Sequence, residues 1–178
     1  MDITLLRHTT PDIAPGTCYG RTDLEVAASF HDEAAAVAAA LPRFDRIVSS
    51  PLQRCRRLAT FLGETHGLPV VDEPRVQEMD FGRWEGKLWS DLPRPELDAW
   101  AADFLNANPH GGETVAILQA RVRDALAHWR DAATRTLIVT HSGVIRAALA
   151  TGETASDFSA NIDFGGFISI SSAEAVKE

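Results

Sequence analysis

The sequence predicts an α/β protein in which three α/β/α layers surround a mainly parallel central sheet. Short apolar segments that favour strands alternate along the chain with longer segments whose apolar residues recur at helical spacing. This alternation is typical of a parallel sheet that carries helices on both faces. In such a fold the ligand binds beyond the carboxyl ends of the strands, which is where functional side chains are sought.

The first strand and the first helix come before Pro42. Residues 3–6 form a short run rich in β-formers, which predicts a strand. A loop punctuated by glycine and proline follows over 11–23. We expect a helix over 26–41, because its apolar residues are spaced for one helix face and proline follows it.

A second strand and helix are expected next. Residues 46–49 predict a strand, and three signals place a helix start directly after it. Ser50 is the expected N-cap, Pro51 occupies the first helical position and Gln53 completes a capping box. A third strand is expected over 69–71.

An irregular stretch over 78–112 contains Trp84, Trp89 and Trp100. We expect residues 1–178 to form a single domain with a helical excursion at about 84–112 that lies over the active site. Most of these indoles are expected to pack in a local core, and one at the mouth of the site would offer a flat apolar face.

The last part of the chain repeats the strand and helix pattern. A long amphipathic helix is predicted over 114–129 and a strand over 136–139. Residues 140–143 turn into a further helix that ends near Gly152, and 158–170 predicts one or two closing strands.

Composition and charge exclude several classes of function. The formal net charge is −8, which argues against a nucleic-acid-binding protein. No apolar run is long enough to cross a bilayer, and the N-terminus has no basic region before an apolar one, so we expect a cytoplasmic protein without a membrane partner. Cys18 and Cys55 are expected to be reduced thiols. Either a monomer or a homodimer is expected.

Two predicted strands end in histidine, at His8 and His141. If both strands are parallel members of one sheet, both imidazoles reach the same crevice, which Arg7 and Arg54 can also face. Arginine is suited to bidentate phosphate binding, and a helix that starts at Ser142 adds backbone N–H groups. The sequence therefore indicates a phosphate site. The remaining histidines are expected to be solvated: His31, His66, His110 and His128.

Metal and serine-nucleophile chemistry find no support in the sequence, which has no HExxH, EF-hand or GxSxG pattern. Phosphoryl transfer without a metal needs a nucleophile and a proton donor for the leaving oxygen. His8 can be the nucleophile. Spacing alone leaves four carboxylates open as the donor: Glu78, Asp80, Glu85 and Glu113.

Five segments in order resemble the histidine phosphatase superfamily, whose fold is also called phosphoglycerate-mutase-like. The segments are Leu5–His8, Ser49–Arg54, Glu78–Gly86, Gly111–Thr114 and Thr140–Arg146. The segment Thr17–Leu24 further resembles the alpha-ribazole phosphatase branch, which acts late in cobalamin nucleotide-loop assembly.

The resemblance implies a metal-independent phosphomonoesterase without a cofactor, acting on a small-molecule phosphomonoester that the branch identifies as alpha-ribazole 5′-phosphate. It implies that His8 is phosphorylated, that Glu78 is the acid/base and that Glu113 has a supporting role. It also implies that Arg7, Arg54 and His141 hold the phosphoryl group and that further substrate contacts come from Thr9, Thr22, Glu113 and Ser142.

The chain departs from the family pattern at three positions. Thr9 replaces a glycine, Thr10 stands where glutamate is common, and Ala14 stands where an asparagine often assists phosphate binding. Thr9 would offer a hydroxyl donor instead. Two rival functions stay open: a phosphoglycerate mutase, and a phosphate-ester-binding protein without turnover.

Overall fold

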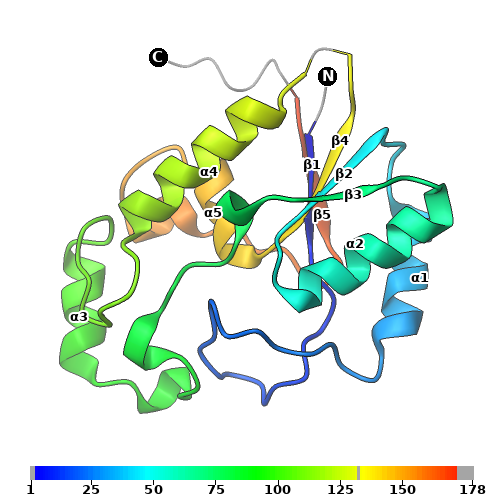
Figure 1. Cartoon of the computed structure of the whole chain (residues 1–178). Coiled ribbons are helices and arrows are strands. Elements are labelled where there is room, and N and C mark those ends of the chain that lie inside the picture. Colours follow the sequence, from blue (N-terminus) through cyan, green and yellow to red (C-terminus); the bar gives the residue numbers. More distant parts are fainter. Residues whose placement is uncertain (1–2, 132, 172–178) are drawn as a thin grey trace.

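The computed structural model describes residues 3–131 and 133–171. Its centre is a five-stranded sheet of order β3-β2-β4-β1-β5 (Figure 1). Three neighbouring pairs are parallel, and β5 alone pairs antiparallel, with β1. The strands are β1 (Ile3–Arg7), β2 (Arg46–Ser49), β3 (Val70–Asp72), β4 (Thr136–Thr140) and β5 (Phe167–Ile170). The predicted α/β class with a mainly parallel sheet is confirmed.

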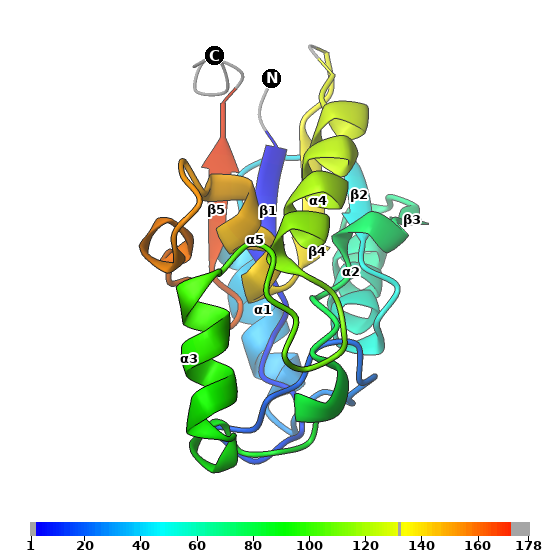
Figure 2. The same cartoon turned by 90° about the vertical axis from the view of Figure 1, so that its left-hand side faces the viewer.

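Helices cover both faces of this sheet, as Figures 1 and 2 show. One face carries α1 (Phe30–Ala40) and α2 (Gln53–His66), and the other carries α4 (Val115–Trp129) and α5 (Ser142–Leu149). Successive strand residues point to opposite faces, so Leu5 packs toward α4 and α5 whereas Leu6 packs toward α1 and α2. The two resulting cores give the three expected layers.

The register of the sheet brings two strand ends together. Arg7 at the end of β1 pairs with Thr140 at the end of β4. The next residues, His8 and His141, therefore leave the sheet at the same edge. On the other side of β4, Ser49 of β2 pairs with Val139.

The predicted start of α2 is wrong. Leu52 is extended, with φ −63° and ψ 134°, and the helix begins at Gln53 without a side-chain cap. The hydroxyl of Ser50 accepts a long hydrogen bond from the N–H of Leu52 at 3.3 Å and lies 2.8 Å from Nε2 of His141. The oxygen that the local capping signature assigned to the helix thus makes its shorter contact with a distant residue.

Two other boundaries also differ from the prediction. Helix α1 begins at Phe30 and not at Val26, because Val26 forms an isolated antiparallel bridge with Pro11. At the end of the chain the single strand β5 follows a short 3₁₀ turn over Ala155–Phe158. By contrast, α4 begins as expected, with the Thr114 hydroxyl accepting a hydrogen bond from the N–H of Ile117.

The stretch between β3 and α4 holds three 3₁₀ turns and one helix, α3 (Arg94–Ala102), near the carboxyl end of β1 (Figure 2). It packs on the loop after β1 through a small core of Cys18, Trp84 and Leu92. Backbone hydrogen bonds also join these two segments. For example, the N–H of Cys18 donates to the carbonyl of Lys87 at 2.7 Å. None of the helices in the described residues is both long and apolar enough to span a membrane.

Candidate active site

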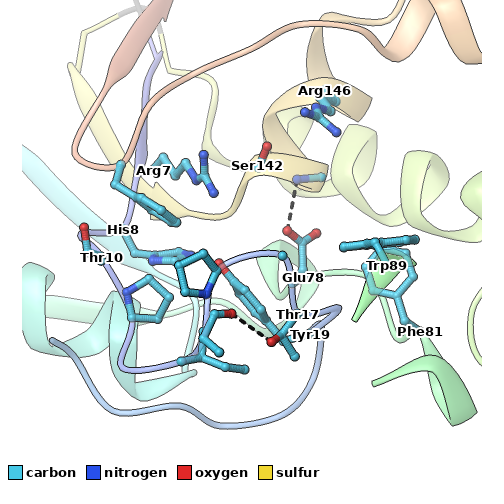
Figure 3. A pocket seen from close by; sticks show the side chains of 17 residues that line it. Arg7, His8, Thr10, Thr17, Tyr19, Glu78, Phe81, Trp89, Ser142 and Arg146 are labelled. Carbon is cyan, nitrogen blue, oxygen red and sulfur yellow. Dashed lines mark hydrogen bonds between the residues drawn. The ribbon is translucent and has the colours of Figure 1, made fainter. Parts of the chain in front are cut away.

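A cavity of about 430 Å³ opens where β1 and β4 end (Figure 3). Its wall includes Arg7 and His8 from the end of β1, Glu78 from the loop after β3, and Ser142 and Gly143 from the start of α5. The loop after β1 contributes a further part of the wall: Thr10, Pro11, Ile13, Ala14, Pro15, Gly16, Thr17 and Tyr19. The crevice is therefore at the sheet edge that the sequence indicated.

His8 is 1% exposed, and its Nδ1 lies 2.7 Å from the carbonyl oxygen of Thr9. Because a carbonyl can only accept, this contact places the ring proton on Nδ1 and leaves the lone pair of Nε2 free. Burial, followed by the charge of Arg54, lowers the pKa of His8 to about 3. The imidazole is thus neutral near pH 7, which is the form a nucleophile needs.

His141 lies beside His8, with the two ring centroids 5.2 Å apart and the rings edge to face. It is fully buried, and its Nε2 is 2.8 Å from the Ser50 hydroxyl and 3.4 Å from Sγ of Cys55. Burial and the charge of Arg54 hold its pKa well below the usual value. The second imidazole is therefore neutral and fixed by contacts from the β2–α2 connection.

The two arginines supply positive charge without a carboxylate partner. Arg54 is fully buried, and its Nη atoms donate to the carbonyls of Gly20 and Thr22 at 2.7 and 2.8 Å. Arg7 donates from Nη1 to the carbonyl of Ile162 at 2.7 Å. Across residues 3–131 and 133–171 neither forms an ion pair, and both Nε atoms are buried without a partner. Such a pair of cations, with Arg54 fully buried and Arg7 partly buried, favours an anionic ligand.

Glu78 is the only one of the four candidate carboxylates that lines the cavity (Figure 3). Its Oε2 accepts a hydrogen bond from the N–H of Gly143 at 3.0 Å, and its Oε1 accepts one from Met79 N–H at 2.9 Å. Its own carbonyl accepts hydrogen bonds from Arg21 and Arg121. The side chain is thus fixed against the first turn of α5 and lines the same cavity as His8.

The other three carboxylates are occupied elsewhere. Asp80 accepts from the N–H of Gly82 at 2.8 Å, and Glu85 accepts from the N–H groups of Arg21, Thr22 and Phe81. Glu113 accepts from Nε and Nη2 of Arg121 at 2.6 and 2.8 Å. Since Arg121 also donates to the carbonyl of Glu78, Glu113 acts on the site through that arginine.

Five residues that were predicted to hold the phosphoryl group or contact the substrate do not line the cavity: Thr9, Thr22, Arg54, Glu113 and His141. The Thr22 side chain turns to Glu85, and its carbonyl supports Arg54. Thr9 is fully buried, and its hydroxyl has no partner among the described residues. Ser142, by contrast, does lie in the wall. The two threonines therefore contact their arginine and histidine neighbours through the backbone.

The aromatic residues separate into a core and a wall. Trp84 is fully buried, whereas Trp89 is 36% exposed and lines the cavity with Phe81. The prediction that His110 is solvated is wrong. It is 1% exposed, accepts a hydrogen bond from Gly112 N–H at 3.0 Å and lies edge to face with Trp84. A buried aromatic cluster thus anchors the segment that presents Trp89.

Sequence reasoning missed three residues in the cavity wall: Tyr19, Arg146 and Phe164. Arg146 had a usable signal, because it lies one helical turn after Ser142 and therefore on the same face. Tyr19 lies in the Thr17–Leu24 segment, which carries a resemblance but no assigned role for this residue, and Phe164 stands in a loop that no local pattern marks. Within the described ranges, no three His, Cys, Asp or Glu side chains gather in a way that could hold a metal ion.

A model of the histidine phosphatase superfamily (branch 1) matches residues 3–164. The metal-independent phosphoserine phosphatase of Arabidopsis thaliana is 31% identical over 157 residues, which are 82% of this chain and 66% of that protein. The glucosyl-3-phosphoglycerate phosphatase of Mycobacterium tuberculosis is 35% identical over 70% of this chain and 58% of its own length. The adenosylcobalamin/alpha-ribazole phosphatase of Salmonella typhimurium is 33% identical over 116 residues, which are 60% of this chain and 55% of that protein. The matches thus span less than two thirds of these relatives.

Solved structures agree with this similarity. A phosphoglycerate mutase from Thermus thermophilus superposes with a TM-score of 0.77 at 30% identity, covering 96% of this chain and 92% of that one. The mycobacterial glucosyl-3-phosphoglycerate phosphatase gives a TM-score of 0.80 at 28% identity, covering 94% and 88%. The similarity therefore extends over nearly the whole fold, including the strand ends that form the cavity.

Proposed function

Since the chain belongs to branch 1 of the histidine phosphatase superfamily, we propose that it hydrolyses small phosphate monoesters through a phosphohistidine on His8. The observation that carries this proposal is the state of His8. Its imidazole is neutral, its Nε2 is free, and the guanidinium groups of Arg54, fully buried, and Arg7, partly buried, lie close by without carboxylate partners among the described residues.

In the first step, Nε2 of His8 attacks the phosphorus atom. A P–N bond forms while the bond from phosphorus to the leaving oxygen breaks, and protonated Glu78 gives its proton to that oxygen. Arg7 and Arg54 offset the charge on the phosphoryl oxygens, as preorganised donors do in a water-poor site. His141 faces the same group from the end of β4.

In the second step, a water molecule attacks the phosphorus of phospho-His8. Glu78, now a carboxylate, removes a proton from this water while the P–N bond breaks. His8 returns to the neutral imidazole, and inorganic phosphate leaves. The same side chain therefore serves as acid and then as base.

No step of this scheme uses a metal ion. The positive field comes from side chains, chiefly the guanidinium groups of Arg7 and Arg54. This part of the proposal is tested by removal of divalent ions, which is taken up below.

The two rival functions are separated by simple assays. Turnover of nitrophenyl phosphate that is lost in His8→Ala supports the phosphatase and excludes a protein that only binds phosphate esters. Interconversion of 2- and 3-phosphoglycerate faster than phosphate release would favour a mutase. Both assays use the same purified chain.

For the substrate we propose alpha-ribazole 5′-phosphate, an intermediate of cobalamin biosynthesis. Trp89 supports this choice, because its partly exposed indole lines the cavity and offers a face for the benzimidazole. The segment that resembles the ribazole branch also contacts this wall. Thr17 forms a bridge with Leu88, and the N–H of Trp89 donates to the carbonyl of Gly16 at 2.9 Å.

Arg146 favours a second class of substrate, in which the leaving alcohol carries an acidic group. Its Nε donates to the carbonyl of Ala160 at 2.9 Å, and among the described residues it forms no ion pair. Relatives named for phosphoserine and for glucosyl-3-phosphoglycerate act on compounds of this kind.

A panel of phosphate esters decides between the two classes. Stacking on Trp89 is worth about 1–3 kcal/mol, which raises kcat/KM for the ribazole ester by roughly tenfold or more over small esters. Trp89→Ala removes that preference if stacking causes it. A higher kcat/KM for phosphoserine or glucosyl-3-phosphoglycerate, lost in Arg146→Gln, would assign the acidic class instead.

A further inference from the structure

We infer that Phe164 is a positioning residue for Arg7, a role that rests on the proposed phosphate site. The centre of the Arg7 guanidinium lies 3.8 Å from the centroid of the Phe164 ring. The same ring lies 5.6 Å from that of His8 and is 38% exposed in the cavity wall. One aromatic side chain thus covers a face of the cation and borders the nucleophile.

The backbone around Phe164 is tied to the two residues it covers. Gly165 N–H donates toward the carbonyls of Arg7 and His8 at 3.2 and 3.1 Å, and Arg7 N–H donates to the Gly166 carbonyl at 2.9 Å. Gly165 has φ +71°, a backbone conformation that residues with a side chain rarely adopt. This turn leads the chain into β5, which runs beside β1. The ring is therefore held over Arg7 by short-range contacts on its C-terminal side.

These contacts determine which edge of Arg7 is free. Nη1 is used by the carbonyl of Ile162, and one face of the guanidinium is covered by the ring. Nε remains buried without a partner in the described residues. Nε and Nη2 form the edge through which arginine binds two oxygens of a phosphate in parallel. Phe164 and Ile162 together present this edge to the ligand.

Phe164 has a second effect, because it excludes water from one face of the cation. A charge with less water around it interacts more strongly with an anion. A cation–π contact of this kind corresponds to about 3- to 30-fold in an equilibrium constant. Loss of the ring should therefore weaken phosphate binding by a factor in this range.

The test is the dissociation constant of inorganic phosphate, measured by calorimetry. Phe164→Leu keeps an apolar side chain but lacks a π face, and we expect about tenfold weaker binding. Phe164→Trp, which restores a π face, should bind within about threefold of the wild type. Phe44→Leu is the matched control, since Phe44 packs on His66 (ring centroids 4.7 Å apart) and does not line the cavity. It should bind phosphate as the wild type does.

A double-mutant cycle separates positioning from general packing. If Phe164 acts through Arg7, Phe164→Leu adds little in an Arg7→Ala background, because coupled residues are not additive. Additive losses would overturn the inference, as would equal binding by the wild type and Phe164→Leu. If the wild type does not bind phosphate, the phosphate site itself fails and the inference falls with it. Activity that survives together with unchanged phosphate binding in Phe164→Leu rejects the role of Phe164 alone.

Discussion

The carboxylate of Glu78 accepts a hydrogen bond from the backbone N–H of Gly143, 3.0 Å away in the first turn of α5. This contact joins the loop after β3 to the helix that follows His141. It also places the carboxyl group of Glu78 at the N-terminus of α5. The proposed acid/base is therefore fixed by the same turn that carries the second imidazole.

Replacement of Gly143 by alanine should displace Glu78. A Cβ at this position would lie 2.2 Å from Oε1 of Glu78, closer than any real contact allows. We expect kcat for alkyl phosphates to fall by about 10²-fold, the lower end of the range for loss of a general acid, while the chain stays folded. Steady-state kinetics and a thermal unfolding curve measure the two quantities. Unchanged kcat in a folded variant would show that the position of Glu78 does not matter.

Glu78→Gln tests the proton donor itself. A poor leaving group needs a proton and a good one does not, so alkyl phosphates should slow by about 10²–10⁴-fold and nitrophenyl phosphate far less. Glu113→Gln is the control, because Glu113 binds Arg121 and lies outside the cavity wall. It should slow both kinds of ester to a similar extent. Equal slowing of both esters in Glu78→Gln would assign Glu78 to binding.

The buried imidazole makes stability depend on pH. The pKa of His8 is about 3 in the folded chain and about 6.5 in the unfolded chain. Between these values the unfolded chain binds a proton that the folded chain does not, so stability falls as pH drops below 6.5. From pH 7 to pH 5 the His8 contribution to the free energy of unfolding falls by about 2 kcal/mol.

Urea unfolding at the two pH values measures this effect. His8→Asn should lose about 2 kcal/mol less than the wild type between pH 7 and pH 5. Phosphate must be absent from the buffer, because an anion bound to Arg7 and Arg54 would stabilise the folded chain. An identical pH dependence in both proteins would mean that the pKa of His8 is the same in the folded and the unfolded chain.

Removal of divalent ions should leave activity in place. The described residues place the guanidinium groups of Arg7 and Arg54 near His8, and these provide the charge that a metal would otherwise supply. Dialysis against a strong chelator, followed by an assay with nitrophenyl phosphate, checks this expectation. Loss of activity with recovery on addition of a divalent ion would contradict it.

The sequence predicts the parts of the site that depend on strand ends. His8 and His141 each follow an apolar strand, and parallel pairing of β1 with β4 brings them to the same edge. Short apolar runs rich in β-formers predict such strands, and the fold rule then places the crevice. Arg54 was also predictable, because it lies in the first turn of the helix after β2.

Other parts of the site depend on contacts between distant segments, which no local pattern reveals. Phe164 reaches Arg7 only because the chain returns along β1 through Gly165 and β5. Ser50 was assigned to a helix cap by its neighbours, yet its hydroxyl contacts His141, which is 91 residues away. Glu78 could be chosen among the four carboxylates only after the structure showed that it alone lines the cavity and that the other three are hydrogen-bonded elsewhere.

Chemical mapping of the phosphoenzyme tests the central claim most directly. The protein is mixed with a ³²P-labelled phosphomonoester, quenched in base and digested, and the labelled residue is identified. The account predicts a label on His8 that is stable to base and labile to acid, as a phosphoramidate is, and that is absent from His8→Ala. A label that persists in His8→Ala, or that resides on another residue, would contradict the account.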